Sequence, residues 1–467
     1  MKLKSVCLIR VPNYLLYQEK LQIPLGLLYI AGYIRKYGVN VAICDLAEQP
    51  PERWKDLIPK DFDLYGVSAT TGDMPIANKV GSLIKELYPK SLLIIGGAHP
   101  SALPAQTLQE GPWDVACRGE AEQTVLELAL GNPYPRGIAF KYKKPKDDGR
   151  IHIAFTKPRA YWEDLNALPF PAWDLMENIF GRGLVEKGEE GTCITCSRGC
   201  PFACSFCATM DVFKRTYRVR SVQNIYDEIA YLKEVYKVKS IRLVDELVML
   251  DREHFTGICR AMGRLGMRWR THSRADILCK NKDLLKVAKD NGITEMAIGV
   301  ENPSDDILKL NNKKVTEAQC REAIYAIKET GIKSKAYFII GLPGESWDTV
   351  KGMIDWIREV KPDRTTLSTF VPYPNCDVYA NPKKYNYKLI HPKDWQLAWI
   401  LGYEGTSEDF MGETEFMTNK DLIEARQMLY DFMINEGFKE PSPEGFKHDL
   451  EAYRQAILGR HECSERV

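Results

Sequence analysis

Apolar residues recur along the chain in two alternating patterns. Short runs rich in Val, Ile and Leu, such as 91–98 and 333–341, alternate with longer stretches whose apolar residues lie three or four positions apart, as in 75–88. The runs indicate buried strands and the longer stretches indicate amphipathic helices. Repeated alternation of strand and helix predicts parallel sheets covered on both faces, so we expect an α/β protein.

The alternation falls into two blocks, which predict the domain organisation. Residues 1–145 are expected to form a doubly wound, Rossmann-like domain. Residues 146–190 contain closely spaced prolines and read as an extended linker. Six strand and helix units in 191–380 predict an open, partial (β/α)6 barrel. Residues 381–467 are polar with helical spacing, which predicts a helical C-terminal cap.

Composition narrows the classes of partner and compartment. The 467 residues include 64 Lys and Arg against 63 Asp and Glu, so no large charge excess favours nucleic acid or an anionic membrane. No apolar stretch approaches the roughly 20 residues of a membrane span, and no signal peptide is evident. We therefore expect a cytoplasmic protein. In that reducing compartment the 13 cysteines indicate metal ligands and core thiols, not disulfides.

Three cysteines carry the clearest chemical signal. Cys200, Cys204 and Cys207 form C-x3-C-x2-C directly after the first strand of the second block, at the sheet edge where α/β proteins bind ligands. Three thiolates suit a [4Fe–4S] cluster whose fourth iron stays open for another ligand. A zinc site completed by Cys193 or Cys196, or cysteines of the core, are the alternatives.

The segment "CSRGCPFACSFC" resembles the C-x3-C-x-Φ-C signature of the radical S-adenosylmethionine (SAM) superfamily, with Phe206 as the aromatic residue. Further segments resemble landmarks of that superfamily in the same order over about 190–380. They are "IRLVDE" with Asp245 and Glu246, "THSRAD" with Arg274, "IGVEN" with Glu301, "FIIGLPGE" with Gly341, Gly344 and Glu345, and "TFVPYPNCDVY".

The resemblance implies a [4Fe–4S] cluster held by the three cysteines and SAM bound to its open iron, yielding a 5′-deoxyadenosyl radical. It places Phe206 near the adenine and Glu301 and Arg274 at the polar groups of SAM. The full set of SAM-binding candidates is Phe206, Asp245, Glu246, Arg274, Glu301 and Gly341. Structural ion pairing of the strand-end residues and a core position for Phe206 remain the alternatives.

The first block resembles the cobalamin-binding domain that precedes many radical SAM barrels, through "IPLGLLYIAGYIR", "GVSATTGD", "LLIIGGAHPS" and "VACRGEAEQT". The candidate cobalamin contacts lie at strand ends, and they are Ser68, Ala69, Thr70, Gly96, Gly97 and His99. Where methionine-synthase-like domains have D-x-H-x-x-G, this chain has Asp45 and Ala47, so the axial imidazole is missing. The domain could also be a scaffold that has lost its cofactor.

The predicted function is methyl transfer to an unactivated carbon or phosphorus centre of a small-molecule or peptide substrate. The reaction would use a 5′-deoxyadenosyl radical, methylcobalamin and a flavodoxin- or ferredoxin-like electron donor. A non-methylating rearrangement or cyclisation is the main alternative. A methylthiotransferase ranks low, because Cys7 and Cys44 lack a third thiol at the next strand end. A structural Fe–S or electron-carrier protein is the non-enzyme alternative. No catalytic side chain is identified.

Overall fold

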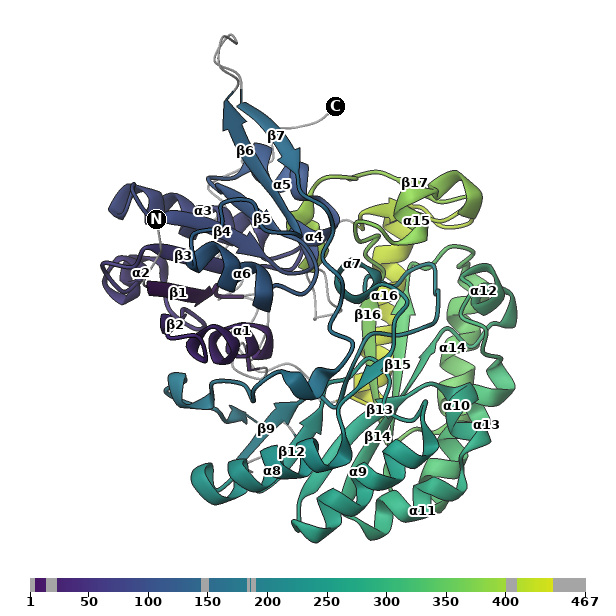
Figure 1. Ribbon diagram of the computed structural model, residues 1–467. Helices are drawn as coiled ribbons and strands as arrows, with labels where there is room; N and C mark the ends of the chain where they lie inside the picture. The colour runs from purple at the N-terminus through teal and green to yellow at the C-terminus, as the bar shows by residue number, and fades with distance from the viewer. Residues whose placement is uncertain are drawn as a thin grey trace.

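Two seven-stranded sheets form the frame of the molecule (Figure 1), counted over the residues that the computed structural model describes, 5–13, 23–143, 151–182, 185, 190–399 and 410–439. The first sheet and its helices lie above the second in this view, and the C-terminal elements lie beside both. The mixed α/β fold that the sequence predicts is confirmed.

The first sheet has the strand order β2-β1-β3-β4-β5-β6-β7. Strands β1 to β5 are parallel, and β6 and β7 add an antiparallel hairpin at the edge. The order reverses between β1 and β3, which is the switch point where open α/β sheets bind ligands. The strands are β1 Ser5–Arg10, β2 Asn40–Asp45, β3 Leu64–Ser68, β4 Leu92–Gly96, β5 Val115–Cys117, β6 Ile138–Lys143 and β7 Ile151–Phe155.

Both faces of this sheet are buried, as alternation along β1 illustrates. Val6 and Leu8 pack with α1 and α6, in a core that continues into the second sheet. Cys7 and Ile9 point the other way and pack with α2, α3 and α5. The helices are α1 Leu25–Arg35, α2 Pro51–Leu57, α3 Met74–Leu87, α4 Ala98–Ala102, α5 Pro104–Glu110 and α6 Glu122–Ala129.

The hairpin of β6 and β7 changes the predicted extent of the first unit. Because β7 pairs with β6, this sheet continues to Phe155, beyond the predicted boundary at residue 145. Residues 144–150, which include the predicted boundary, lie outside the described residues.

The second sheet has the order β16-β15-β14-β13-β12-β9-β8. Six strands are parallel and form the expected open barrel, while the short β8 adds antiparallel to β9, inside the stretch predicted as linker. The strands are β8 Gly181–Arg182, β9 Glu190–Ile194, β12 Ser240–Leu243, β13 Arg268–Ser273, β14 Ile293–Glu301, β15 Lys333–Ile340 and β16 Arg364–Thr369.

Helices cover the outer face of the barrel, as Figure 1 shows. They are α8 Val222–Tyr236, α9 Arg252–Arg264, α10 Ala275–Lys280, α11 Asp283–Asp290, α12 Asp305–Leu310, α13 Glu317–Glu329 and α14 Trp347–Val360. Local sequence fixes several of their first turns. Ser346 and Thr349 form a capping box at the start of α14, and Thr316 and Gln319 form one at α13.

The segment between the two sheets is extended and packs on both. The Ala172 N–H donates to Leu28 O at 3.0 Å, and the Trp173 indole donates to Glu228 on α8 at 3.1 Å. A Cβ at Gly32 would lie 2.6 Å from Phe170 O, so glycine in α1 is what lets this segment cross the helix closely. The prolines predicted an extended path, and the packing fixes its direction.

The C-terminal part is mixed, not wholly helical as predicted. It contains α15 Asp377–Ala380, a two-stranded ribbon of β17 Lys388–Leu389 and β18 Gly412–Glu413, and α16 Asn419–Asn435, which packs on α14 and β16. The remainder of the predicted cap, 400–409 and 440–467, lies outside the described residues. Among those described, no helix combines the length and apolar character needed to cross a bilayer.

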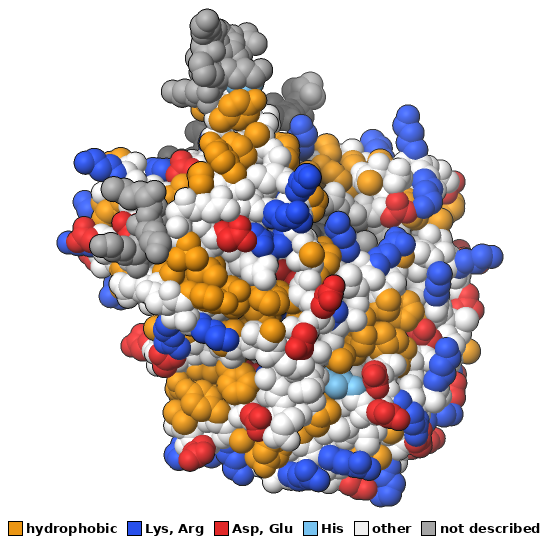
Figure 2. Space-filling model, in the orientation of Figure 1, with side chains coloured by type: hydrophobic (Ala, Val, Ile, Leu, Met, Phe, Trp, Pro, Cys, Tyr) orange, Lys and Arg blue, Asp and Glu red, His pale blue; other side chains and the backbone are white. Residues whose placement is uncertain are grey.

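Charges are interspersed over the face of the molecule drawn in Figure 2, where Lys and Arg alternate with Asp and Glu. This distribution agrees with the nearly balanced charge of the sequence. A dominant patch of one sign is not visible on this face.

Candidate functional site

The three cysteines of the motif lie on one anchored loop after β9. Its first part pairs as a short ribbon, β10 Ser197–Arg198 with β11 Arg218–Val219, and α7 Met210–Phe213 follows the loop. Ser205 N–H donates to Asn311 O at 3.0 Å, and the Asn312 amide donates to Ala203 O at 2.6 Å. The loop that carries the thiols is therefore held against the end of α12.

Exposure separates these cysteines from most others. Cys200, Cys204 and Cys207 are partly exposed, whereas all other described cysteines except Cys279 are buried. Cys193 and Cys196, the residues considered for a zinc site, are each 1% exposed. The described part of the chain contains no group of three His, Cys, Asp or Glu side chains arranged to hold a metal ion. A cubane differs from a single ion in that each thiolate binds a different iron, so its ligands need not meet at one point.

Two cations lie beside Cys204. Burial raises the pKa of the Cys204 thiol above its usual value, while Lys313 and Arg274 act against this rise. Burial also raises the pKa of Cys200, with the neighbouring Cys207 and Cys204 adding to the rise. Positive charge next to a thiol stabilises the thiolate that ligates metal.

Arg274 connects the loop to neighbouring segments through all three of its guanidinium nitrogens. Its Nη1 donates to Cys204 Sγ at 3.6 Å, its Nη2 to Lys313 O at 2.7 Å and its Nε to Asp276 at 3.0 Å. The guanidinium also lies 3.7 Å from the ring centroid of Phe202. These three bonds give Arg274 a supporting position beside the loop and use three of its five N–H donors, so its direct contact with SAM stays a prediction.

Lys313 pairs with Glu301 next to the loop. The Lys313 ammonium lies 2.5 Å from Glu301 Oε1 and 5.8 Å from the ring centroid of Phe206. Both partners are largely buried, and Glu301 has φ 63°, a left-handed conformation at the end of β14. Two of the predicted SAM contacts, Phe206 and Glu301, thus meet at one cation that the sequence reasoning did not single out.

Asp245 and Glu246 support the start of the loop that carries Cys200, Cys204 and Cys207, which we call the cluster loop after the cluster it is predicted to hold. Asp245 is 1% exposed and accepts hydrogen bonds from Ser197 and, at 2.8 Å, from the Cys196 N–H. Glu246 accepts from the Gly199 N–H at 3.2 Å. Asp245 Oδ1 therefore supports the backbone of this loop, while its Oδ2 is buried without a partner among the described residues, and its contact with SAM stays a prediction.

Gly341 ends β15 at φ 89° and is enclosed by protein. A Cβ there would lie 2.9 Å from the Phe410 ring, and its N–H donates to the carboxylate of Glu345. Glu345 is fully buried and also accepts from Asn302 Nδ2 at 2.8 Å. Gly341 thus forms a tight turn with Phe410 packed on the side where a side chain would project, and its contact with SAM stays a prediction.

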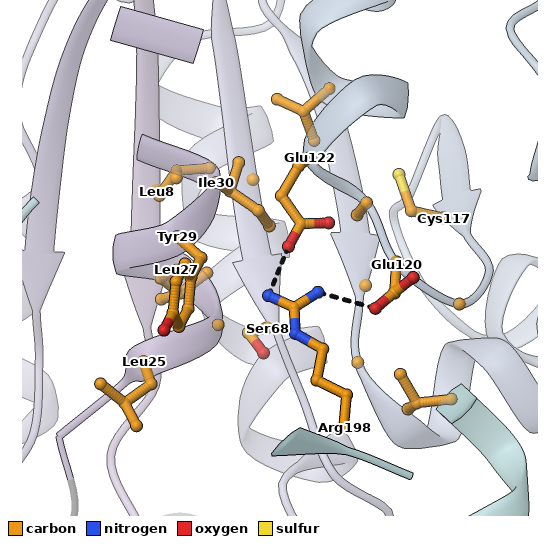
Figure 3. A pocket seen from close by; sticks show the side chains of 18 of the residues that line it. Leu8, Leu25, Leu27, Tyr29, Ile30, Ser68, Cys117, Glu120, Glu122 and Arg198 are labelled. Carbon is orange, nitrogen blue, oxygen red and sulfur yellow. Dashed lines mark hydrogen bonds and ion pairs between the residues drawn. The ribbon is translucent and has the colours of Figure 1, made fainter. Parts of the chain in front are cut away.

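A cavity of about 210 Å³ lies between the two sheets (Figure 3). The carboxyl ends of β3 and β4 contribute Ser68, Gly96 and Gly97, and the cluster-loop side contributes Arg198 and Glu246. Most of the remaining lining is apolar, from α1 and the first sheet, including Leu8, Leu25, Leu27, Ile30 and Cys117. The cavity thus joins the edges where both predicted cofactor sites lie.

The cobalamin candidates divide into two groups. Ser68, Gly96 and Gly97 line the cavity, whereas Ala69, Thr70 and His99 are absent from its lining. Thr70 bonds Asp73 through its N–H, at 2.7 Å, and through its hydroxyl. A Cβ at Gly97 would lie 2.4 Å from Ala69 O, so close approach of two strand ends requires that glycine.

His99 is 2% exposed, and its ring lies edge-on to Trp395 with centroids 5.4 Å apart. Burial lowers its pKa to about 4. The turn after β2 has no imidazole, because Ala47 stands at the position considered for an axial ligand; its N–H donates to Asp45 Oδ1 at 3.0 Å. The described residues therefore offer no imidazole to the cavity from either turn.

Buried ion pairs connect the two units beside the cavity. Arg198 Nη1 contacts Glu120 at 2.7 Å and its Nη2 contacts Glu122 at 2.8 Å, as the dashed lines in Figure 3 mark. Arg218, opposite Arg198 in the ribbon, contacts Glu120 at 2.9 Å. Because Arg198 stands two positions before Cys200, these pairs tie the cluster loop to the first sheet.

Three functional positions were missed by sequence reasoning. Lys313 and Asn311 lie in the turn after α12, and Arg198 lies inside the cysteine motif. The dipeptide Asn311 and Asn312 before a lysine was the available signal, since Asn is typical of turns that bond neighbouring backbone. Nothing in the local sequence indicated that Arg198 would meet Glu120.

Two family models match the two parts of the chain that carry these candidate sites. The model of the B12 binding domain matches residues 19–129, and that of the Radical SAM superfamily matches residues 194–357. The chain therefore contains a B12-binding domain followed by a radical SAM domain. Such domains take cobalamin, and a [4Fe–4S] cluster with SAM, respectively.

Individual proteins resemble most of the chain. The anaerobic magnesium-protoporphyrin IX monomethyl ester cyclase of Rubrivivax gelatinosus is 29% identical over 376 residues, which cover 76% of this chain and 65% of the cyclase. An uncharacterised methyltransferase of Pyrococcus horikoshii is 28% identical over 365 residues, covering 76% of this chain and 77% of that protein. This chain thus spans slightly less than two thirds of the cyclase.

A solved structure shares the fold. It is that of the radical SAM methyltransferase TsrM from Kitasatospora setae with cobalamin and a [4Fe–4S] cluster bound. The TM-score is 0.65 at 16% identity, and the match covers 81% of this chain and 74% of that chain. At this identity the likeness is one of fold.

The residues present suit the implied cofactors. Three partly exposed thiols with two cations nearby suit an anionic cluster. Beside the cavity, Glu122 Oε2 is buried without a donor among the described residues, and the amide side chains of a corrin are donors. At Gly96 an added Cβ would have Cys117 as its nearest neighbour, at 3.6 Å, so that strand end leaves room for a ligand.

Proposed function

We propose that this protein is a cobalamin-dependent radical SAM methyltransferase acting on an unactivated carbon or phosphorus centre of a small-molecule or peptide substrate. The observation that supports it is the cavity between the sheets, because Ser68 and Gly96 of the first sheet face Thr195 and Glu246 of the second across one space. A group bound at the strand ends of the first unit would thus lie next to the loop of the three cysteines.

Residues of this chain would divide the work of binding. Cys200, Cys204 and Cys207 would hold the cluster, while Lys313 and Glu301 would meet the charged groups of SAM. When bound, the cluster and SAM supply one-electron bond cleavage and cobalamin supplies a transferable methyl group.

The first unit would hold cobalamin against the largely apolar wall of the cavity, through Ser68, Gly96 and Gly97. Leu25, Leu27 and Ile30 of α1 form part of that wall, and exclusion of water protects reactive species from side reactions. The missing imidazole at Ala47 means that the lower face of a bound corrin would lack that ligand.

We also infer a cytoplasmic location and a flavodoxin- or ferredoxin-like reductant. The support is chemical, since thiol ligands and a low-potential cluster require a reducing compartment and an external electron source.

A non-methylating cyclisation is the second candidate. It is favoured by the similarity to the cyclase of Rubrivivax gelatinosus, whose name describes ring formation. The two candidates share the same cofactors and differ in what becomes of SAM.

Product analysis distinguishes them. Full-length protein, reconstituted without oxygen with iron, sulfide, hydroxocobalamin and SAM and then reduced, should release both S-adenosylhomocysteine and 5′-deoxyadenosine. Release of 5′-deoxyadenosine alone would favour the cyclisation. Absence of both products, from protein whose iron and cobalt contents are complete and whose reductant is active, would contradict the radical SAM mechanism in either form.

The ligand assignment has its own test. Cys204→Ala should lower bound iron and the absorbance of the cluster to near background, because the remaining two thiols cannot hold a [4Fe–4S] cluster. Cys279→Ala is the matched control, since Cys279 is also partly exposed but lies on α10. Equal iron content in the Cys204→Ala protein and the wild type would exclude the proposed cluster site.

A further inference from the structure

The inside of the barrel carries cations, three of them toward the amino ends of β13, β15 and β16 and one on the short strand β12. On β12 and β15, Ile241, Leu243, Ala336 and Phe338 are buried under the helices. Side chains alternate along a strand, so the residues next to these buried ones, such as Arg242 and Lys335, face the inside of the open barrel. Five charged residues of this inner set form what we call the basic row: Arg242, Arg270, Glu295, Lys335 and Arg364.

The strand register brings the members of the basic row together. Arg242 is paired with Arg270 across β12 and β13, and Arg270 with Glu295 across β13 and β14. Lys335 is paired with Arg364 across β15 and β16. Neighbouring strands lie about 5 Å apart, so several positive charges share one small region.

The basic row contains too little negative charge to balance its cations. Glu295 contacts Arg270 at 3.3 Å and Arg364 at 3.2 Å. Among the residues that the structure describes, no carboxylate forms an ion pair with Arg242 or Lys335. The Lys335 ammonium lies 5.3 Å from the centroid of the Tyr337 ring and feels the charge of Glu295 without an ion pair. Four cations thus share one carboxylate.

Such an excess is costly away from water, since like charges repel and each loses hydration. Burial lowers the pKa of Lys335 to about 8; Glu295 acts against this shift, and the three arginines of the row add to it. Burial, followed by Arg242, also lowers the pKa of Arg270. A bound anion would relieve both costs.

The row is separate from the cations near the cysteines. Arg274 follows β13 and Lys313 follows α12, beyond the carboxyl ends of the strands, and both are engaged with Cys204 or Glu301. Arg270, Lys335 and Arg364 lie toward the amino ends of their strands, and Arg242 lies within the short strand β12. The charge of the basic row is therefore not used by the cluster loop.

We infer that the basic row binds an anionic group of the substrate, a carboxylate or a phosphate, and so orients the substrate inside the barrel. The inference rests on the proposed function, because it names the substrate class of the same barrel. Guanidinium groups are suited to both anions, with Arg242 and Arg270 as neighbouring forks and Lys335 as a point charge.

Inorganic phosphate is the probe for the test. The full-length holoenzyme is melted in increasing phosphate and in chloride of equal ionic strength, with and without saturating SAM. We expect phosphate to raise the melting temperature above that in chloride, as a ligand of the folded state does, and SAM to leave this difference in place. No difference between phosphate and chloride in the wild type, or its loss with SAM, would overturn the inference.

Matched variants locate the effect. Lys335→Gln and Arg242→Gln should weaken phosphate binding about tenfold each, because each removes a charge-assisted hydrogen bond. Lys351→Gln and Arg260→Gln remove the same charges from exposed helix positions and should leave it unchanged. Equal weakening in all four variants would indicate a general charge effect and reject the site.

The outcome of the phosphate melting test does not depend on whether the protein transfers a methyl group. The phosphate response needs no methyl transfer, so a protein that releases no S-adenosylhomocysteine can still show it. Conversely, an active methyltransferase without the phosphate response would retain the proposed function and lose only this inference.

Discussion

At the scale of single residues, charge placement around the thiols is the defining feature. Lys313 is 6% exposed and pairs with Glu301, while Arg274 donates to Cys204. Two buried cations balance a glutamate and a loop of thiols that become negative on ligating iron. The side chains near the cysteines are therefore arranged for negative charge before any cofactor is considered.

We expect Lys313→Ala to lower the free energy of unfolding by about 3–5 kcal/mol, because Glu301 would keep a buried charge without its partner. Urea denaturation of the full chain measures the change. The double variant Lys313→Met with Glu301→Gln removes both charges and should recover most of the loss. The control is Lys351→Ala, on an exposed helix face, which should change the free energy of unfolding by less than about 0.5 kcal/mol. A loss below about 1 kcal/mol in Lys313→Ala would show that the pair is hydrated.

At the scale of elements, the turn between β15 and α14 is held by one carboxylate. Glu345 accepts from Gly341 N–H and from Asn302 Nδ2, and its carbonyl accepts from Thr414 of the C-terminal part at 2.8 Å. Three segments distant in sequence thus meet at a buried acid. Burial raises the pKa of Glu345 to about 8.

This raised pKa predicts a pH dependence with a defined sign. The folded state binds the proton of Glu345 more tightly than the unfolded state, whose value is about 4.5. Its contribution to stability is therefore complete below pH 4.5 and is lost as pH rises through about 8, by at most about 1.4 kcal/mol per pH unit. Relative to Glu345→Gln, the wild type should lose stability between pH 5 and 8 in urea titrations. Parallel pH profiles for the two proteins would contradict this.

At the scale of the whole molecule, two units are joined by buried charges beside the cavity. Arg198 and Arg218 come from the ribbon before and after the cysteine loop, and Glu120 and Glu122 come from the first unit. The residual side-chain exposure of Glu120 is 3% and that of Glu122 is 4%. If the two units separated from each other, Glu120 and Glu122 would lose their arginine partners and leave buried carboxylates unpaired, which is unfavourable.

Arg198→Gln should therefore cost about 3–5 kcal/mol of stability and speed amide hydrogen exchange in α6, which begins at Glu122. Arg35→Gln is the matched control. Arg35 also connects the first unit to the linker, through Asp174 at 2.6 Å, but both side chains are about half exposed, so its loss should cost less than about 1 kcal/mol. If exchange in α6 were unchanged in Arg198→Gln, the pairs would not hold the units together.

The sequence by itself determined the elements and the cysteine loop. Alternation of buried runs and helical spacing predicted the parallel strands of both sheets, because burial on both faces leaves a continuous apolar run such as Leu92–Ile95. The spacing of Cys200, Cys204 and Cys207 predicted a ligand loop, because short spacers keep thiols on one turn. Both signals are local, so one stretch of chain contains them.

Only the tertiary structure decided the roles of the surrounding side chains. Asp245 Oδ1 accepts from backbone N–H groups and Arg274 donates to Cys204, which the motif alone did not indicate. Arg198 meets Glu120 across 78 positions of sequence, and the basic row forms only when five strands align. Such pairings depend on which segments become neighbours and what they exclude from water, and a linear pattern does not contain that information.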